Sequence, residues 1–205
     1  MTGNGTRDER RYLVPQFEEQ TTYGRKDTDP YNKLFEDRIV FLGAPVDDIS
    51  ANDVTAQILA LEGMDPDRPI ALYINSPGGS LTAMLAICDT MRYVRPPIET
   101  TCVGQAGSAA AVLLATGSPG RRAALTGARI LLHEPAIEVS SGYATDLDIQ
   151  AREVLRLRRQ TEEIVAEATG RDPETVRRDL DRERYFTAAE AKDYGLIDEV
   201  LTARR

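Results

Sequence analysis

Hydrophobic residues occur in short continuous runs that alternate with amphipathic stretches over the first two thirds of the chain. Such runs are typical of buried strands, and they fall at 38–43, 70–75, 98–103 and 128–133. Between them, apolar residues recur at spacings of three and four, which predicts helices. The predicted helices start near residues 50, 81 and 108. This alternation predicts an α/β fold with mainly parallel strands and right-handed crossovers.

The second half of the chain begins with one long helical pattern over 145–169. Its apolar stripe consists of Leu147, Ala151, Val154, Leu157, Thr161, Ile164 and Ala168. Gly170 is a suitable C-terminal stop. Ile149, Leu155 and Val165 lie off this stripe, which predicts that the helix packs against another subunit. The alternative is that these three residues are ordinary surface hydrophobes.

Weaker signals lie at the two ends of the chain. "TAAE" at 187–190 matches a capping box that opens a short helix, and 196–201 predicts a final strand. Residues 1–30 are polar with several glycines and prolines, which predicts a flexible N-terminal arm. The remaining residues, 31–205, then form one domain.

Charge and composition restrict the class of protein. The chain has 25 basic and 33 acidic residues and a formal net charge of −8, which disfavours binding to nucleic acid or to an anionic membrane. No secretory signal or membrane-spanning stretch is visible, and Cys88 and Cys102 lie in apolar segments, so we expect a cytoplasmic protein with buried, reduced thiols. The presence of only one histidine and two separated cysteines disfavours a metal site.

Three strand ends carry residues with chemical potential. The turn Pro77-Gly78-Gly79 follows the second strand, Ser108 follows the third, and His133, the only histidine, ends the fourth. In parallel sheets, ligand and catalytic groups gather beyond the carboxyl ends of the strands. Each residue also has a structural explanation. Ser108 suits a helix N-cap, the glycines suit a tight turn, and a lone histidine is most often structural.

The combination favours nucleophilic catalysis. A serine nucleophile needs a base and an oxyanion hole, and a helix start beside a Gly-Gly turn offers free N–H groups for the latter. Ser108 is not part of a G-x-S-x-G elbow, which disfavours an α/β-hydrolase esterase.

Four motifs occur in an order and spacing that resemble a known family. They are "YINSPGGS", "GQAGSAAAVLLATG", "ILLHEP" and "DRERYFTAAEAKDYGLIDEV". Together they resemble the proteolytic subunit of the Clp protease, a serine peptidase, and the likeness covers about residues 31–200. The stretches "DPYNKLFEDRIVFLG" and "SANDVTAQIL" look most like the second of the paralogous subunits of actinobacteria.

This resemblance implies roles for five residues. Ser108 becomes the nucleophile, His133 the general base and Glu183 the third member of the triad, while the N–H groups of Gly79 and Ala109 form the oxyanion hole. The product would be short peptides cut from unfolded polypeptides.

The resemblance also implies an architecture and partners. The fold would be a repeated ββα, crotonase-like spiral head, with a handle of a helix and a strand at about 134–170. The peptide would bind beside residues 136–143. Subunits or paralogues would form two stacked seven-membered rings on which an ATPase unfoldase docks. ATP is used by that partner, so no cofactor is expected in this subunit.

The chain departs from the family pattern near these residues. Glu183 replaces the usual Asp, Glu134 follows the histidine where Gln is usual, Gly107 stands where Ala is usual, and 136–143 lacks the usual Gly-Gly. If Glu183 does not serve, Asp179 or Asp181 is the next candidate, or a Ser–His dyad. A different class of function is a weakly active or inactive ring-forming partner of a catalytic paralogue. Acyl-CoA chemistry on the same fold is disfavoured by the Ser/His pair and the acidic charge.

Overall fold

The computed structural model describes residues 15–22, 24–134 and 143–203, and it divides after Asp37 into two compact units. The first unit contains an antiparallel hairpin of β1 (Phe17–Thr21) and β2 (Gly24–Thr28), followed by α1 (Pro30–Glu36). The polar composition of residues 1–30 does not predict this hairpin. Flexibility of the arm, and the boundary at residue 30, stay predictions.

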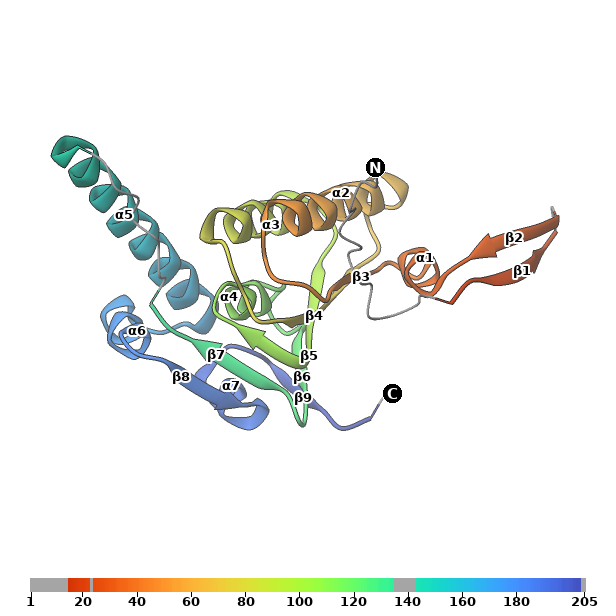
Figure 1. Ribbon diagram of the computed structural model, residues 1–205. Coiled ribbons are helices and arrows are strands. Elements are labelled where there is room, and N and C mark those ends of the chain that lie inside the picture. The colour runs from red at the N-terminus through yellow and green to blue at the C-terminus, as the bar shows by residue number, and fades with distance from the viewer. Residues whose placement is uncertain (1–14, 23, 135–142, 204–205) are drawn as a thin grey trace, which may run out of the picture. The chain divides into compact units, whose positions relative to one another are not determined.

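The second unit is built on a seven-stranded sheet (Figure 1). β3, β4, β5, β6 and β9 follow one another across the sheet and are parallel. β7 pairs in parallel with the last residues of β5, and β8 is antiparallel to β7. The strands are β3 (Ile39–Leu42), β4 (Ile70–Ser76), β5 (Ile98–Gly107), β6 (Arg122–Leu125), β7 (Arg129–Leu132), β8 (Arg184–Thr187) and β9 (Glu199–Leu201). The predicted α/β fold with mainly parallel strands is confirmed.

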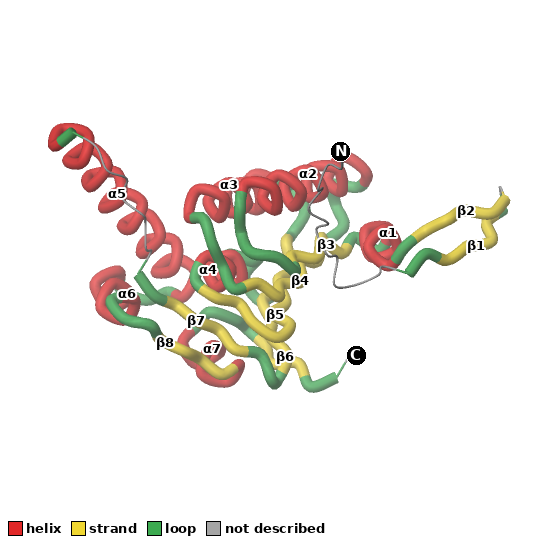
Figure 2. Tube along the Cα trace, viewed as in Figure 1, coloured by secondary structure: helices red, strands yellow, loops and turns green. Residues whose placement is uncertain are grey.

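Six helices connect the described strands of this unit. They are α2 (Asp48–Met64), α3 (Leu81–Tyr93), α4 (Ala109–Ala115), α5 (Ala144–Thr169), α6 (Pro173–Leu180) and α7 (Ala188–Tyr194). α2 and α3 lie side by side, and α4 packs against β4 to β7 (Figure 2). On β4, Ile70, Leu72 and Ile74 are fully buried and the residues between them are more exposed. The helices therefore cover one face of this strand more completely than the other. No helix of the described residues is long and apolar enough to cross a membrane.

Several predicted boundaries need correction. β5 continues through Gly107, four residues beyond the strand predicted at 98–103. α2 starts at Asp48, slightly before the predicted start near residue 50. Its N-cap is Asp47, and Ser50 completes a reciprocal capping box at the third helical position. The capping box of Thr187 and Glu190 at the start of α7 is confirmed.

Helix α5 matches the predicted range closely and ends at Gly170, which adopts a left-handed conformation (φ 67°). The prediction for Val165 is wrong: this residue is fully buried within the chain and belongs to the core. The C-terminal part of α5 contacts both α4 and α6, so residues off the main stripe are buried there too. Ile149 and Leu155, nearer the N-terminal end, remain 64% and 53% exposed. Figure 1 shows this end of α5 extending away from the sheet.

Both thiols lie in the core, as the sequence predicts. Burial raises the pKa of Cys88 to about 11 and that of Cys102 to about 12. Protonated, inaccessible thiols are poor nucleophiles. Neither cysteine is therefore a candidate for catalysis.

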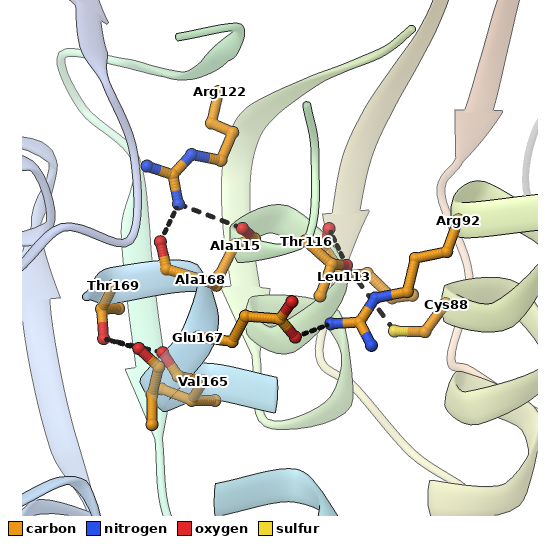
Figure 3. A network of polar contacts seen from close by, with 11 residues as sticks. Cys88, Arg92, Leu113, Ala115, Thr116, Arg122, Val165, Glu167, Ala168 and Thr169 are labelled. Atoms are coloured by element: carbon orange, nitrogen blue, oxygen red, sulfur yellow. Dashed lines mark hydrogen bonds and ion pairs between the residues drawn. The ribbon is translucent and has the colours of Figure 1, made fainter. Parts of the chain in front are cut away.

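A polar network fixes the end of α4 to α5 (Figure 3). The buried Arg122 guanidinium donates hydrogen bonds to the carbonyls of Ala115 (3.1 Å) and Ala168 (2.7 Å), and it forms an ion pair with Asp198 at 2.7 Å. The hydrogen bonds that Asp198 accepts from Arg122 lower the pKa of its carboxyl group. α4, α5, β6 and the start of β9 are thus joined through one side chain.

A second buried arginine holds the connection from α2 to β4. Arg38 has a left-handed backbone (φ 63°), and its guanidinium donates to four main-chain carbonyls at 2.8–3.0 Å. These carbonyls belong to Leu61, Asp65, Arg68 and Pro69. A side chain that replaces so many backbone donors serves as the C-terminal cap of α2.

Candidate active site

The carboxyl-end side of the strands contains a cavity of about 230 Å³. Gly79, Ser108, Ala109 and His133 all line it. These residues follow β4, β5 and β7, so the topology brings three separate segments of the sequence to one place. Most of the remaining wall is apolar and comes from Pro77, Leu81, Met84, Val112, Leu132 and Leu180.

Ser108 has a strained backbone at the start of α4. Its φ of 48° and ψ of −117° lie in a region that residues other than glycine rarely adopt. Its N–H donates to the Leu131 carbonyl at 2.7 Å, and its side chain makes no capping hydrogen bond. Ser108 is therefore the N-cap residue of α4 by position, but its side chain does not cap the helix. Strain of this kind typically costs about 1–3 kcal/mol and is common at functional sites.

The Gly79 N–H takes no part in the backbone hydrogen bonds that join Val46 to the turn after β4. Val46 donates to the Gly78 carbonyl at 2.9 Å and accepts from Ser80 N–H at 2.7 Å, so Gly79 between them makes neither of these bonds. Within the described residues, the N–H groups of Gly79 and Ala109 have no hydrogen-bond acceptor. Two free N–H donors beside one serine are what an oxyanion hole requires.

Glycine is required where the Gly78-Gly79 turn approaches the main chain of Val46 and Gly107. A Cβ on Gly79 would lie 2.2 Å from the Val46 carbonyl oxygen, and one on Gly78 would lie 2.3 Å from the Gly107 carbonyl oxygen. Both residues also have positive φ. A Cβ on Gly107 would lie 2.5 Å from the Pro77 carbonyl oxygen, so the departure from Ala at this position allows the turn and the serine strand to approach closely.

His133 is half-buried, and its ring is held by the adjacent main chain. Nδ1 lies 2.6 Å from the carbonyl oxygen of Glu134. An Nδ1–H donor to a carbonyl leaves Nε2 as the free acceptor, which is the tautomer that a general base needs. No hydrogen bond joins Ser108 and His133 in the part of the chain that the structure describes.

Glu183 is exposed and does not hydrogen-bond to His133 in this conformation. Its carboxylate accepts a hydrogen bond from the Tyr185 hydroxyl at 3.1 Å. β7 and β8 pair Leu132 with Arg184, so continuing this antiparallel register by one step sets His133 opposite Glu183. Opposite residues point to the same face of a sheet, with Cβ atoms about 4.5–5.5 Å apart.

Asp179 and Asp181 are the other two candidate carboxylates. Each has another partner or lies further than Glu183 from His133 in the strand register. Asp179 pairs with Arg184 at 2.7 Å and accepts from the Tyr194 hydroxyl at 2.8 Å. Asp181 is exposed, with Arg182 at 3.9 Å. The strand register therefore favours Glu183 over both as the partner of His133.

Helix α5 contacts the residue after the histidine, which the sequence motifs do not reveal. Arg158 forms ion pairs with both Glu134 and the buried Glu162, the latter at 2.7 Å. The hydrogen bond to Glu162 is the largest of the effects that raise the pKa of Arg158. The i, i+4 spacing of Arg158 and Glu162 is visible in the sequence, but the pairing with Glu134 depends on the fold.

Comparison with known proteins identifies the family of the chain. The Clp protease family matches residues 22–204. The ATP-dependent Clp protease proteolytic subunit 2 of Corynebacterium jeikeium is 57% identical over 197 residues, covering 96% of this chain and 94% of the relative. Proteolytic subunit 1 of Corynebacterium glutamicum is 58% identical over 195 residues, covering 95% and 94%. Proteolytic subunit 1 of Corynebacterium diphtheriae is 55% identical over 206 residues, covering 100% and 99%. With this extent of matching, the chain belongs to the Clp protease family of proteolytic subunits.

Proposed function

We propose that this chain is a serine endopeptidase, the proteolytic subunit of an ATP-dependent Clp protease that cuts unfolded polypeptides to short peptides. One observation carries the proposal: a serine with a strained backbone, whose side chain makes no capping bond, shares a cavity with the only histidine and with two N–H groups that have no acceptor among the described residues. Structural roles explain neither the strain nor the free donors. The names of the relatives agree with this activity.

The reaction follows from the positions of these groups. Ser108 Oγ attacks the peptide carbonyl carbon while His133 Nε2 takes its proton, and the oxyanion is stabilised by the N–H groups of Gly79 and Ala109. The C–N bond then breaks as the imidazolium gives its proton to the leaving amine. Water, activated by the same histidine, releases the acyl group from Ser108. His133 must first move within hydrogen-bond distance of Ser108, about 2.6–3.2 Å.

Ser108 is the direct test of this function. A fluorophosphonate probe is expected to label the wild-type protein at Ser108, and Ser108→Ala is expected to abolish labelling. Mass spectrometry of the labelled peptide identifies the residue. A folded wild-type protein that remains unlabelled would contradict the proposal.

Glu183 is the acid that we assign to the triad, because the register sets it opposite His133. Its carboxylate must leave the Tyr185 hydroxyl and replace the Glu134 carbonyl as the acceptor at Nδ1, once that carbonyl has set the tautomer of the ring. Glu183→Ala should lower kcat for a peptide substrate about 10²–10⁴-fold, the range usual for loss of an acid–base partner, while Glu183→Asp retains or raises it. Asp181→Ala is the control, and its kcat should stay close to that of the wild type. Equal activity of Glu183→Ala and wild type would remove Glu183 from the mechanism.

A second candidate is a ring-forming, weakly active partner of a catalytic paralogue. It is favoured by one observation: His133 Nδ1 and the Glu183 carboxylate each have a different partner, Glu134 and Tyr185. Mixing the chain with the paralogue separates the two functions. If the chain is a scaffold, its wild-type and Ser108→Ala forms should raise the activity of the paralogue equally. If the chain is a peptidase, the mixture with Ser108→Ala should be less active, because the contribution of Ser108 is lost.

The assembly belongs to the same proposal. We assign α5 to a handle on a crotonase-like head, through which two seven-membered rings meet in the cytoplasm, with an ATPase unfoldase on the ring face and no cofactor in this subunit. The exposed Ile149 and Leu155 support a subunit contact on α5. Replacing both with Glu should lower the sedimentation coefficient. A wild-type species of 22.6 kDa at working concentration would contradict the oligomer.

A further inference from the structure

We infer that Arg158 on α5 is a positioning residue for His133, which it orients through the side chain and carbonyl of Glu134. This inference rests on the proposed function, since it concerns how the base of that reaction is held. Arg158 contacts neither the serine nor the histidine, so its effect passes through the segment that follows β7.

The first link is the contact between Arg158 and the Glu134 carboxylate. The Arg158 side chain is 18% exposed, and its Nε also donates to Glu162 at 2.7 Å. Glu162 is itself buried, which limits the freedom of the guanidinium. The Glu134 side chain is 40% exposed, so the pair is partly shielded from solvent and is stronger than a fully exposed one. Glu134 is therefore tethered to a packed part of α5.

The second link is the main chain of Glu134. The tether fixes the residue whose carbonyl oxygen lies 2.6 Å from His133 Nδ1. A carbonyl accepts a proton and cannot donate one, so it selects the Nδ1–H form of the neutral imidazole and leaves Nε2 free. This is the acceptor function that an acid provides in a triad. While Glu183 is held by Tyr185, the Glu134 carbonyl takes its place.

The sole histidine allows this to be tested without reference to activity. Protein labelled with ¹⁵N only in histidine gives one set of imidazole signals, and these report the tautomer of His133 directly. Wild type and Ser108→Ala should both show the Nδ1–H form. Arg158→Gln should show a mixture of tautomers. Arg156→Gln is the matched control, because Arg156 lies on the same helix and pairs with the exposed Glu153 at 2.7 Å.

Kinetics provide the second measurement. Arg158→Gln should slow fluorophosphonate acylation about 10–10²-fold, the range expected for a small displacement of a catalytic group, with KM for a peptide substrate unchanged. Arg158→Lys should recover part of the rate, because it keeps a charge beside Glu134. Glu134→Ala removes the contact from the other side, on an incompletely buried residue, and should reproduce Arg158→Gln even if the latter fails to fold.

The outcomes separate this inference from the proposed function. If the tautomer and the acylation rate are unchanged in both Arg158→Gln and Glu134→Ala, the positioning role is overturned even though Ser108 is labelled. If Ser108 is never labelled, the peptidase proposal fails, and the tautomer measurement still decides whether Arg158 orients His133. If Arg156→Gln has the same effect as Arg158→Gln, the effect belongs to the helix in general and the inference is overturned.

Discussion

At the residue scale, Ser108 retains a backbone conformation that suits glycine. Ser108→Gly should therefore raise the free energy of unfolding by about 1–2 kcal/mol, because it relieves strain at φ 48°. Ser108→Ala removes the same hydroxyl but keeps a Cβ, so it should change stability little. Thermal or urea denaturation of the two inactive variants measures the difference. Equal stability of the two would contradict the presence of strain.

Gly79 is the second residue with a local prediction. Gly79→Ala adds a Cβ that would lie 2.2 Å from the Val46 carbonyl oxygen, so the turn must move and displace its N–H. We expect a loss of about 10²–10³ in kcat, as for removal of one oxyanion-hole donor. Gly63→Ala is the matched control. Gly63 lies in α2 with no heavy atom near the added Cβ, and Ala should stabilise that helix by about 0.5–1 kcal/mol.

The sequence predicts some of these residues and not others, for a physical reason. Ser108, His133, Gly79 and Ala109 follow strands of a parallel sheet, so their place beyond the carboxyl ends is implied by chain order. The Glu134 carbonyl, Tyr185 and Arg158 act through contacts that depend on strand register and helix packing. A backbone carbonyl has no sequence signal at all.

At the element scale, Arg38 determines how α2 ends. Arg38→Lys should lower the free energy of unfolding by about 3 kcal/mol, because one ammonium cannot satisfy four carbonyls that a planar guanidinium reaches together. Arg68→Lys makes the same chemical change at an exposed site and should have almost no effect. Chemical denaturation of both variants provides the test, and a loss below about 0.5 kcal/mol in Arg38→Lys would contradict the capping role.

The elements that local pattern predicts well are the long and periodic ones. α5 matches its predicted position closely because its apolar residues recur with one helical period, and the strands at 70–76 and 129–132 match because each contains a short apolar run. β6 and β8 are short and contain arginine, so their local pattern is weak. β6 becomes a strand by pairing with β5 and β9, and β8 by pairing with β7. Val165 is buried because α5 contacts both α4 and α6. A single apolar stripe in the sequence predicts only one such contact.

At the scale of the whole molecule, the pair of Arg122 and Asp198 links the middle of the chain to its last strand. The hydrogen bond from Arg122 lowers the pKa of Asp198, so the carboxylate stabilises the folded protein above its unfolded pKa of about 3.9. This contribution is lost as pH falls through the lower folded-state pKa. Asp198→Asn should cost about 2 kcal/mol at pH 7, and the difference should shrink below about pH 4.

The exposed pair of Arg95 and Asp67 is the control for this measurement. Its atoms are 3.6 Å apart and its side chains are 72% and 85% exposed. Asp67→Asn should leave the free energy of unfolding unchanged at both pH values. A gap between wild type and Asp198→Asn that is constant with pH would show that the carboxylate charge is not what stabilises the link.

The place of β9 in the sheet has a consequence for synthesis of the protein. β6 pairs with β9, yet β7, α5, α6, β8 and α7 are translated between them. Until β9 emerges from the ribosome, one edge of β6 has no partner, and open edges invite pairing with other chains. β6 is short, begins with Arg122 and is otherwise "AAL", which makes it a poor template for such pairing. The weakness of β6 as a strand therefore limits aggregation of the nascent chain until β9 has been synthesised.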